Sequence, residues 1–338
     1  MDKEIKDLID HTKEKSMKNQ DIEKTVLRRF LELDPRSEEC KYLGETAREV
    51  TRVTMGNKGR IGSSIGIDFR PCTMNCKFCS LGEKWGLVKE NYDMSEEHII
   101  NVIRSLLSKG FYQFTLRTTE FYSLDMLCKL AKNIRSAVNG KYILTVNTGE
   151  LTTDDANRLK DAGFNAAYHT VRLGEGKDTP FDPQVRIDTM RSIANSRMRL
   201  SCGVDPIGIE HTNDEIIDRI ELFLSLKVAA ICSMKRINVK GTPFEGVPEI
   251  DEMRHAQVAA VVRMASGGRN MVAVHPANLQ GLKWGANHIS VETGANPRDK
   301  DSDMHKKGTF GHEDAVRMIL EAGYEVGVFE DFVKLSPY

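Results

Sequence analysis

The sequence predicts an α/β protein of the TIM type, a (β/α)8 barrel preceded by an N-terminal helical extension. From residue 63 onward, about eight short apolar segments alternate with amphipathic helical segments, and this alternation requires parallel strands with right-handed crossovers. The chain has 338 residues, which accommodates a barrel of roughly 250 residues plus additions. Eight units favour a closed barrel, while a six-unit partial barrel with additions fits the same pattern.

The first 56 residues are expected to be helical. Ile5, Leu8 and Ile9 form one apolar stripe at helical spacing, and residues 22–31 contain a second stripe. Pro35 then breaks the pattern, and another helix is expected at 45–54. These observations divide the chain into an N-terminal helical extension at 1–56, a barrel at 57–325 and a C-terminal tail at 326–338.

Strands and helices are then expected in turn. The predicted strands cover 63–69, 112–117, 141–147, 165–171, 199–205, 228–238, 270–276 and 287–293. The predicted helices cover 95–110, 123–138, 152–162, 183–195, 213–226, 251–265, 279–284 and 312–322. In such a barrel the active site lies at the C-terminal ends of the strands, so the loops that follow the strands are the places to search.

Composition restricts the class of protein. The net charge of −1 gives no reason to expect nucleic-acid binding, and no apolar run approaches the roughly 18 residues of a membrane span. The charged start, residues 1–10, is unlike a signal peptide, so we expect a cytoplasmic protein. Seven cysteines, an odd number, then favour metal binding or catalysis over disulfides.

Three of these cysteines lie together in the loop after the first predicted strand. Cys72, Cys76 and Cys79 have the spacing C-x3-C-x2-C, and thiolates prefer zinc, Cu(I) or iron–sulfur clusters. A structural zinc site normally needs four ligands, whereas this motif stops at three. A [4Fe-4S] cluster can use three cysteines and leave its fourth iron open to a chelating cosubstrate. We therefore predict such a cluster, with zinc binding and simple packing as the alternatives.

With Phe78 just before its last cysteine, this loop resembles the defining loop of the radical S-adenosylmethionine (SAM) superfamily. The resemblance implies that the open iron is chelated by the amino and carboxylate groups of SAM, with Phe78 beside the adenine. It also implies that one electron cleaves SAM to methionine and a 5′-deoxyadenosyl radical, which takes a hydrogen atom from a small-molecule substrate. A low-potential ferredoxin or flavodoxin is the expected electron donor.

Other motifs across roughly residues 45–325 resemble the branch that contains biotin synthase, the [FeFe]-hydrogenase maturase HydE and the methylornithine synthase PylB. Glu120 matches an acid that binds the SAM amino group, although Thr119 replaces the preceding glycine. Arg186 matches an arginine that faces the SAM carboxylate, and Gly208 matches a turn near the adenine. A carboxylate and a guanidinium suit these roles because they form charge-assisted hydrogen bonds with SAM. Without the resemblance, they would be a solvated loop acid and a surface arginine.

Polar residues near the predicted C-terminal strand ends are candidates for the substrate pocket. They are Tyr168, His169, Arg172, Asp205, Lys235, Arg236, His275 and Glu292. Their several cations favour an anionic or zwitterionic substrate, such as an amino acid or cofactor precursor. Tyr168, His169 and His275 are candidate catalytic residues, although strand alternation allows only one of Tyr168 and His169 to face inward. The polar stretch 293–314 is either a lid or a surface loop.

The remaining cysteines separate two interpretations within the branch. Biotin synthase takes sulfur from a second cluster held by cysteines on inner strands, whereas the predicted strands 112–117 and 141–147 contain no cysteine. The extra cysteines are expected to be buried small hydrophobes, or ligands of an auxiliary cluster: Cys40, Cys128, Cys202 and Cys232. The leading prediction is thus a radical SAM enzyme that rearranges, cleaves or remodels its substrate. The alternatives are a sulfur-inserting synthase of the biotin or lipoyl type and a non-catalytic iron–sulfur sensor or scaffold.

Overall fold

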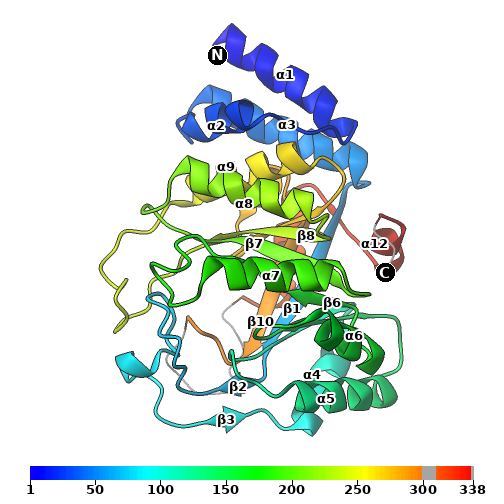
Figure 1. Cartoon of the computed structure of the whole chain (residues 1–338). Coiled ribbons are helices and arrows are strands. Elements are labelled where there is room, and N and C mark those ends of the chain that lie inside the picture. The colour runs from blue at the N-terminus through cyan, green and yellow to red at the C-terminus, as the bar shows by residue number, and fades with distance from the viewer. Residues whose placement is uncertain (299–309, 336–338) are drawn as a thin grey trace.

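The computed structural model describes residues 1–298 and 310–335, and its centre is a closed barrel of eight parallel strands (Figure 1). The barrel strands are β1 (Lys58–Gly66), β4 (Gln113–Arg117), β5 (Ile143–Asn147), β6 (Ala166–Tyr168), β7 (Arg199–Ile207), β8 (Ala230–Lys235), β9 (Met271–His275) and β10 (His288–Gly294). They are hydrogen-bonded in chain order, and β10 pairs with β1 from Arg60↔His288 to Gly66↔Gly294. The predicted closed (β/α)8 barrel is confirmed.

Helices connect successive strands on the outside of the barrel. They are α4 (Glu96–Ser108), α5 (Leu124–Ala137), α6 (Thr153–Ala162), α7 (Pro183–Ala194), α8 (Asn213–Ser225), α9 (Glu252–Ser266), α10 (Leu279–Lys283) and α11 (His312–Glu321). Several begin at residues that accept a hydrogen bond from the first turn, such as Ser95, Thr152 and Thr212. Such N-caps are readable from sequence, which explains why the predicted helix starts lie close to the observed ones.

The N-terminal extension consists of three helices, α1 (Lys3–Met17), α2 (Lys24–Glu32) and α3 (Glu38–Thr54). They pack over α8, α9 and α10 on one side of the barrel (Figure 1). The contact between α3 and the barrel is tight, since a Cβ atom placed on Gly44 would lie 2.2 Å from the Trp284 indole. The extension is therefore part of the packed core and not a separate body.

The C-terminal segment closes the base of the barrel. A short strand, β11 (Glu325–Val326), pairs with the start of β1, and α12 (Phe329–Leu335) follows it. Phe332 is buried against Met55, Tyr112 and Met271, the last two at the N-terminal ends of β4 and β9. The segment predicted as a tail thus contributes a hydrophobic plug below the strands.

Two short strands, β2 (Asp68–Phe69) and β3 (Tyr92–Asp93), and the 3-10 helix Glu83–Trp85 surround the cysteine loop above β1. The stretch predicted as a lid or surface loop, 293–314, begins in β10 and ends in α11, and its residues 299–309 lie outside the described part of the chain. Within the described residues, no helix combines the length and apolarity that a membrane crossing requires.

Candidate active site

A cavity of about 310 Å³ runs through the barrel and opens among the loops at the C-terminal strand ends. All eight strands contribute to its lining, from Arg60, Gln113 and His288 near the base to the cysteine loop at the mouth. This is the end at which barrel enzymes carry their active sites, as the strand order predicted.

The cysteine loop forms the mouth of this cavity. Cys72, Cys76, Phe78 and Cys79 all line it, and Asn75 turns the chain between the cysteines with a φ of 47°. Asparagine is among the residues that tolerate this left-handed conformation, which explains its place in the loop. Backbone hydrogen bonds anchor the loop, with the Cys72 amide donating to the Leu81 carbonyl over 2.7 Å. The loop thus presents three sulfurs and one aromatic ring to the same space.

The thiols suit a cluster better than a single ion. All three are free, and among the described residues no group of three or more His, Cys, Asp or Glu side chains converges to hold one metal ion. A zinc site needs such convergence, whereas the cysteines of a cubane bind three different irons. Burial raises the pKa of Cys76 to about 12 and that of Cys79 to about 11. A bound metal would therefore have to stabilise their thiolates.

Glu120, at the end of the loop after β4, also lines the cavity, and Arg186 on α7 lies behind it. The Arg186 guanidinium donates to both Glu120 oxygens over 3.1 and 3.2 Å, and lies 2.7 Å from Glu150. Arg186 is 2% exposed, stacks over Phe181 and is not among the cavity-lining residues. In this arrangement Arg186 orients Glu120 and is not part of the cavity lining. Its position does not test the predicted contact with the SAM carboxylate, which stays a prediction.

The contacts of Thr119 show why a threonine fits at this position, where the resembled branch carries glycine. Its backbone amide donates to Asp68 Oδ1 over 2.7 Å, and its hydroxyl also bonds the Asp68 carboxylate. Asp68 belongs to β2, so this pair ties the Glu120 loop to the base of the cysteine loop. The threonine side chain therefore supports the site.

Tyr168 and His169 point in opposite directions, as strand alternation requires. Tyr168 lines the cavity, and its hydroxyl donates to Asp205 Oδ2 over 2.7 Å. His169 is not among the lining residues, and its Nε2 lies 3.3 Å from Glu150. Of the two candidates, Tyr168 is the one placed to meet a substrate, and His169 supports the Glu150–Arg186 pair.

Gly208 lies beyond the end of β7 and is not among the lining residues. A Cβ atom at Gly208 would lie 2.3 Å from the Glu210 carboxylate, which pairs with Arg236 over 2.9 Å. Glycine is needed there because the carboxylate occupies the space of a side chain. The position of Gly208 does not test the predicted adenine contact, which stays a prediction.

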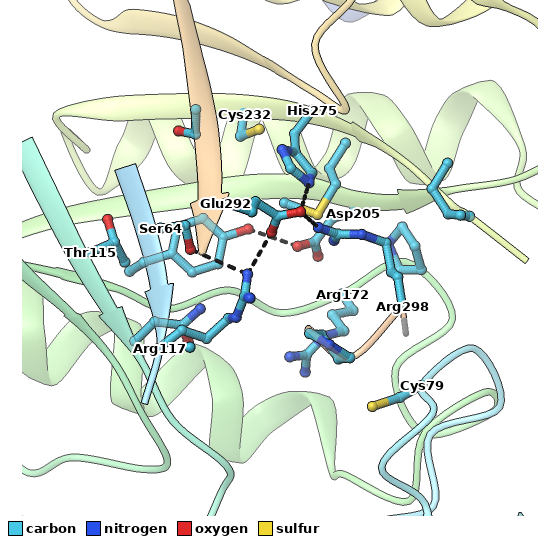
Figure 2. A pocket seen from close by; sticks show the side chains of 18 of the residues that line it. Ser64, Cys79, Thr115, Arg117, Arg172, Asp205, Cys232, His275, Glu292 and Arg298 are labelled. Carbon is cyan, nitrogen blue, oxygen red and sulfur yellow. Dashed lines mark hydrogen bonds and ion pairs between the residues drawn. The ribbon is translucent and has the colours of Figure 1, made fainter. Parts of the chain in front are cut away.

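Two arginines and a histidine converge on Glu292 inside the barrel (Figure 2). Arg117 donates to Glu292 Oε1 over 2.7 Å, Arg298 bonds Oε2, and His275 Nε2 lies 3.7 Å from Oε2. Although burial opposes it, the guanidinium groups of Arg298 and Arg117 hold the pKa of Glu292 well below its usual range. Burial, with Arg298 nearby, lowers the pKa of His275 to about 3, so this imidazole is neutral at neutral pH.

Arg117, Arg298 and Cys232 are among the cavity residues that were not predicted as site residues. Arg117 belongs to the motif before Glu120, but its position on a strand did not reveal that it faces inward. Arg298 follows β10 in an irregular segment that offers no periodicity to read. Cys232 lines the cavity from the same face of β8 as Ala230 and Met234, and whether it is a small hydrophobe or a cluster ligand stays open. Cys202 is part of the hydrophobic core and also borders the cavity.

Comparison with known proteins then fixes the family. The profile of the radical SAM superfamily matches residues 67–253, more than half of the chain, including the three cysteines, Glu120 and Arg186. The chain belongs to the radical SAM superfamily. Members of this family are enzymes that use a [4Fe-4S] cluster and SAM, take electrons from reductants and act on small molecules.

Individual relatives lie in the predicted branch. The chain is 28% identical to biotin synthase of Rickettsia felis over 277 residues, which cover 74% of this chain and 87% of that protein. It is 25% identical to biotin synthase of Gloeothece citriformis over 310 residues, which cover 80% of this chain and 82% of that protein. The fold is similar to that of methylornithine synthase PylB, with a TM-score of 0.81 and 16% identity over 96% of this chain and 99% of the other. The fold is also similar to that of the [FeFe]-hydrogenase maturase HydG, with a TM-score of 0.80 and 15% identity. That comparison covers 94% of this chain and 76% of HydG.

Proposed function

We propose that this radical SAM enzyme abstracts a hydrogen atom from a small anionic or zwitterionic substrate held inside the barrel, to rearrange, cleave or remodel it. The observation that carries the proposal is that the cysteine loop and an excess of basic side chains line the same cavity. Six basic and four acidic residues line it: Arg60, Arg117, Arg172, Lys235, Arg236 and Arg298 against Asp68, Glu120, Asp205 and Glu292. A cavity of this charge favours ligands that carry a carboxylate or phosphate.

The residues at the mouth are assigned to the cofactors. Cys72, Cys76 and Cys79 would bind three irons of the cluster, Phe78 would contact the adenine, and Glu120 would accept hydrogen bonds from the SAM amino group. When bound, the cluster and SAM supply reductive cleavage of SAM to methionine and a 5′-deoxyadenosyl radical. Arg186 and Glu150 would fix the rotamer of Glu120, so that the carboxylate is oriented before SAM arrives.

The residues within the strands are assigned to the substrate. Tyr168 is our first candidate for a catalytic residue, because its hydroxyl reaches the cavity while its hydrogen bond to Asp205 fixes its position. His275 lines the same cavity and is neutral, so its ring nitrogens are available to donate or accept a hydrogen bond. His169 is retained as a positioning residue that acts through Glu150.

For the electron donor we propose a low-potential ferredoxin or flavodoxin, and for the compartment the cytoplasm, where thiols stay reduced. All seven cysteines lie in the described residues and are free, which agrees with a reducing environment. The setting we favour is the biosynthesis of an amino acid or a cofactor.

The test is formation of 5′-deoxyadenosine by anaerobically reconstituted enzyme with dithionite and SAM, measured by liquid chromatography and mass spectrometry. We expect Glu120→Gln to weaken SAM binding about 10- to 100-fold, because a charge-assisted hydrogen bond is lost. Glu97→Gln, the same change at an exposed position of α4, is the matched control. Absence of 5′-deoxyadenosine, or equal SAM binding by the two variants, would count against the proposal.

Sulfur insertion is the second candidate, because curated relatives are biotin synthases and Cys232 lines the cavity. Counting iron separates the two candidates. About four irons per chain correspond to one cluster, and about six to eight would indicate an auxiliary cluster that supplies sulfur. We favour one cluster, because the predicted inner strands 112–117 and 141–147 contain no cysteine that could hold a second one.

A further inference from the structure

Asp205 is a buried carboxylate with an unused oxygen. The residue is 6% exposed and lines the cavity, and its Oδ2 accepts the Tyr168 hydroxyl over 2.7 Å. Its Oδ1 is buried and has no hydrogen-bond partner among the described residues. A buried acceptor that has lost water without gaining a donor is unfavourable, so this oxygen calls for a donor from a ligand.

Each carboxylate oxygen of the other cavity acids already accepts at least one hydrogen bond from the protein. Both oxygens of Glu120 accept from Arg186, and both oxygens of Glu292 accept from the arginines described above. Asp68 accepts from Thr119 and Arg70. Asp205 therefore differs from the other three cavity acids because one of its carboxylate oxygens has no hydrogen-bond donor within the described residues.

No cation of the described chain pairs with Asp205. The described residues place no Lys, Arg or His nitrogen within 4.0 Å of its carboxylate, and the ion pair of nearby Arg172 goes to Glu175 over 3.8 Å. Tyr168 supplies one neutral donor, and Arg172 acts on the carboxylate electrostatically without a direct ion pair. Burial still raises the pKa of Asp205, so these partners do not offset its burial. A protonated amine of a ligand supplies both the donor and the opposite charge.

An excess of positive charge lies across the same cavity. Arg117 and Arg298 share Glu292, so this group keeps one net positive charge. Asp205 and the group formed by Arg117, Arg298 and Glu292 line one cavity together with Cys232 (Figure 2). The cavity therefore offers an acceptor for a cation on one side and a site for an anion on the other.

We propose that Asp205 binds the ammonium group of the substrate and that Arg117 and Arg298 bind its carboxylate, so that the substrate is a free amino acid. This inference rests on the proposed function and narrows its substrate class from anionic or zwitterionic to zwitterionic. Tyr168 acts as a positioning residue in this site, because its hydroxyl holds the Asp205 carboxylate with Oδ1 open. Removing that hydroxyl frees the carboxylate to rotate.

Binding tests the proposal without requiring turnover. Cluster-loaded enzyme is titrated, before SAM is added, with each of the twenty protein L-amino acids and with the matching 2-hydroxy acids, which keep the carboxylate but lack the ammonium. We expect at least one amino acid to bind, at least about 10-fold more tightly than its hydroxy acid. Asp205→Asn should weaken this binding about 10- to 100-fold, and Tyr168→Phe should weaken it less. Asp188→Asn, the same change on the exposed surface of α7, should leave it unchanged.

The affinity for SAM is measured in parallel, because a SAM hydroxyl is the competing donor for Oδ1. Equal binding of amino and hydroxy acids, binding of no amino acid, or a loss of SAM affinity in Asp205→Asn would each overturn the assignment. A misfolded Asp205→Asn variant would be recognised by its cluster content, and Tyr168→Phe would then decide.

A second measurement does not depend on guessing the substrate. A small-molecule extract of the source cells is added to wild-type enzyme, with and without prior N-acetylation by an N-hydroxysuccinimide ester, which removes ammonium charge. We expect the untreated extract to stimulate 5′-deoxyadenosine formation and the acetylated extract to lose this stimulation. Stimulation that survives acetylation would overturn the amine assignment and leave the proposed function intact. Absence of 5′-deoxyadenosine in every sample would instead contradict the proposed function and with it the inference.

Discussion

Replacing Arg186 with methionine should destabilise the cluster-free protein. The side chain is 2% exposed and is shared by Glu120 and Glu150, so its removal leaves two carboxylates facing each other without their cation. Breaking a buried pair costs about 3–5 kcal/mol, and we take the lower value because Glu150 is about a third exposed. For 338 residues the entropy of unfolding is about 0.7 kcal/mol/K, so Tm should fall by about 4 °C.

The assay is thermal unfolding of anaerobic apoprotein followed by circular dichroism. Arg191→Met is the control, since Arg191 lies on the same helix, is 54% exposed and pairs with Asp188 over 3.0 Å. Exposed pairs contribute under about 1 kcal/mol, which corresponds to a change in Tm of about 1 °C or less. If Arg186→Met unfolds within about 1 °C of the wild type, Arg186 is not bound to the two acids in the apoprotein, and its assignment as a positioning residue is wrong.

Three further changes test other parts of the molecule. Cys76→Ala should abolish the brown colour and most of the iron, whereas Cys128→Ala should keep about four irons per chain, and equal iron in both would contradict the ligand assignment. Burial lowers the pKa of His255 to about 4, so the folded state resists its protonation and stability falls as pH drops from about 6.5 towards 4. The free energy of unfolding is measured in urea at pH 7.5 and at pH 5.5. Between these two pH values the wild type should lose about 1 kcal/mol more of this free energy than His255→Gln, and equal losses would refute this. Gly44→Ala should lower stability by about 1–3 kcal/mol through a clash with Trp284, and an unchanged urea midpoint would show that the indole moves aside at no cost.

Much of the fold was readable from the sequence because its determinants are local. Helix starts follow from apolar periodicity and from N-caps such as Thr152 and Thr212. Strand bounds were less accurate, since the first strand was predicted at 63–69 and is Lys58–Gly66. The closed barrel then follows from the number of units. The spacing of Cys72, Cys76 and Cys79 likewise carried the cluster prediction, because all three ligands lie in one loop.

The missed features depend on contacts between distant segments. Whether Arg186 faces a ligand or Glu120 is decided by the distance between α7 and the loop after β4, which no local pattern contains. The partners of Glu292 come from β4, β9 and the segment after β10. The inward position of Cys232 could not be read from the sequence, because parity along a strand shows which residues share a face, but not which face lines the cavity. The plug at Phe332 was missed because a short terminal helix has little periodicity.

This plug also bears on the order of catalytic events. Phe332, Met55, Tyr112 and Met271 close the base of the barrel, so small molecules exchange at the end that carries the cysteines. With SAM seated between the cysteine loop and Glu120, Asp205 and Glu292 lie deeper, within the strands. If SAM fills the mouth, a substrate bound at that depth would have to enter before it, and the product would leave after the fragments of SAM. The architecture of the barrel would then impose a binding sequence in which SAM closes an already occupied site.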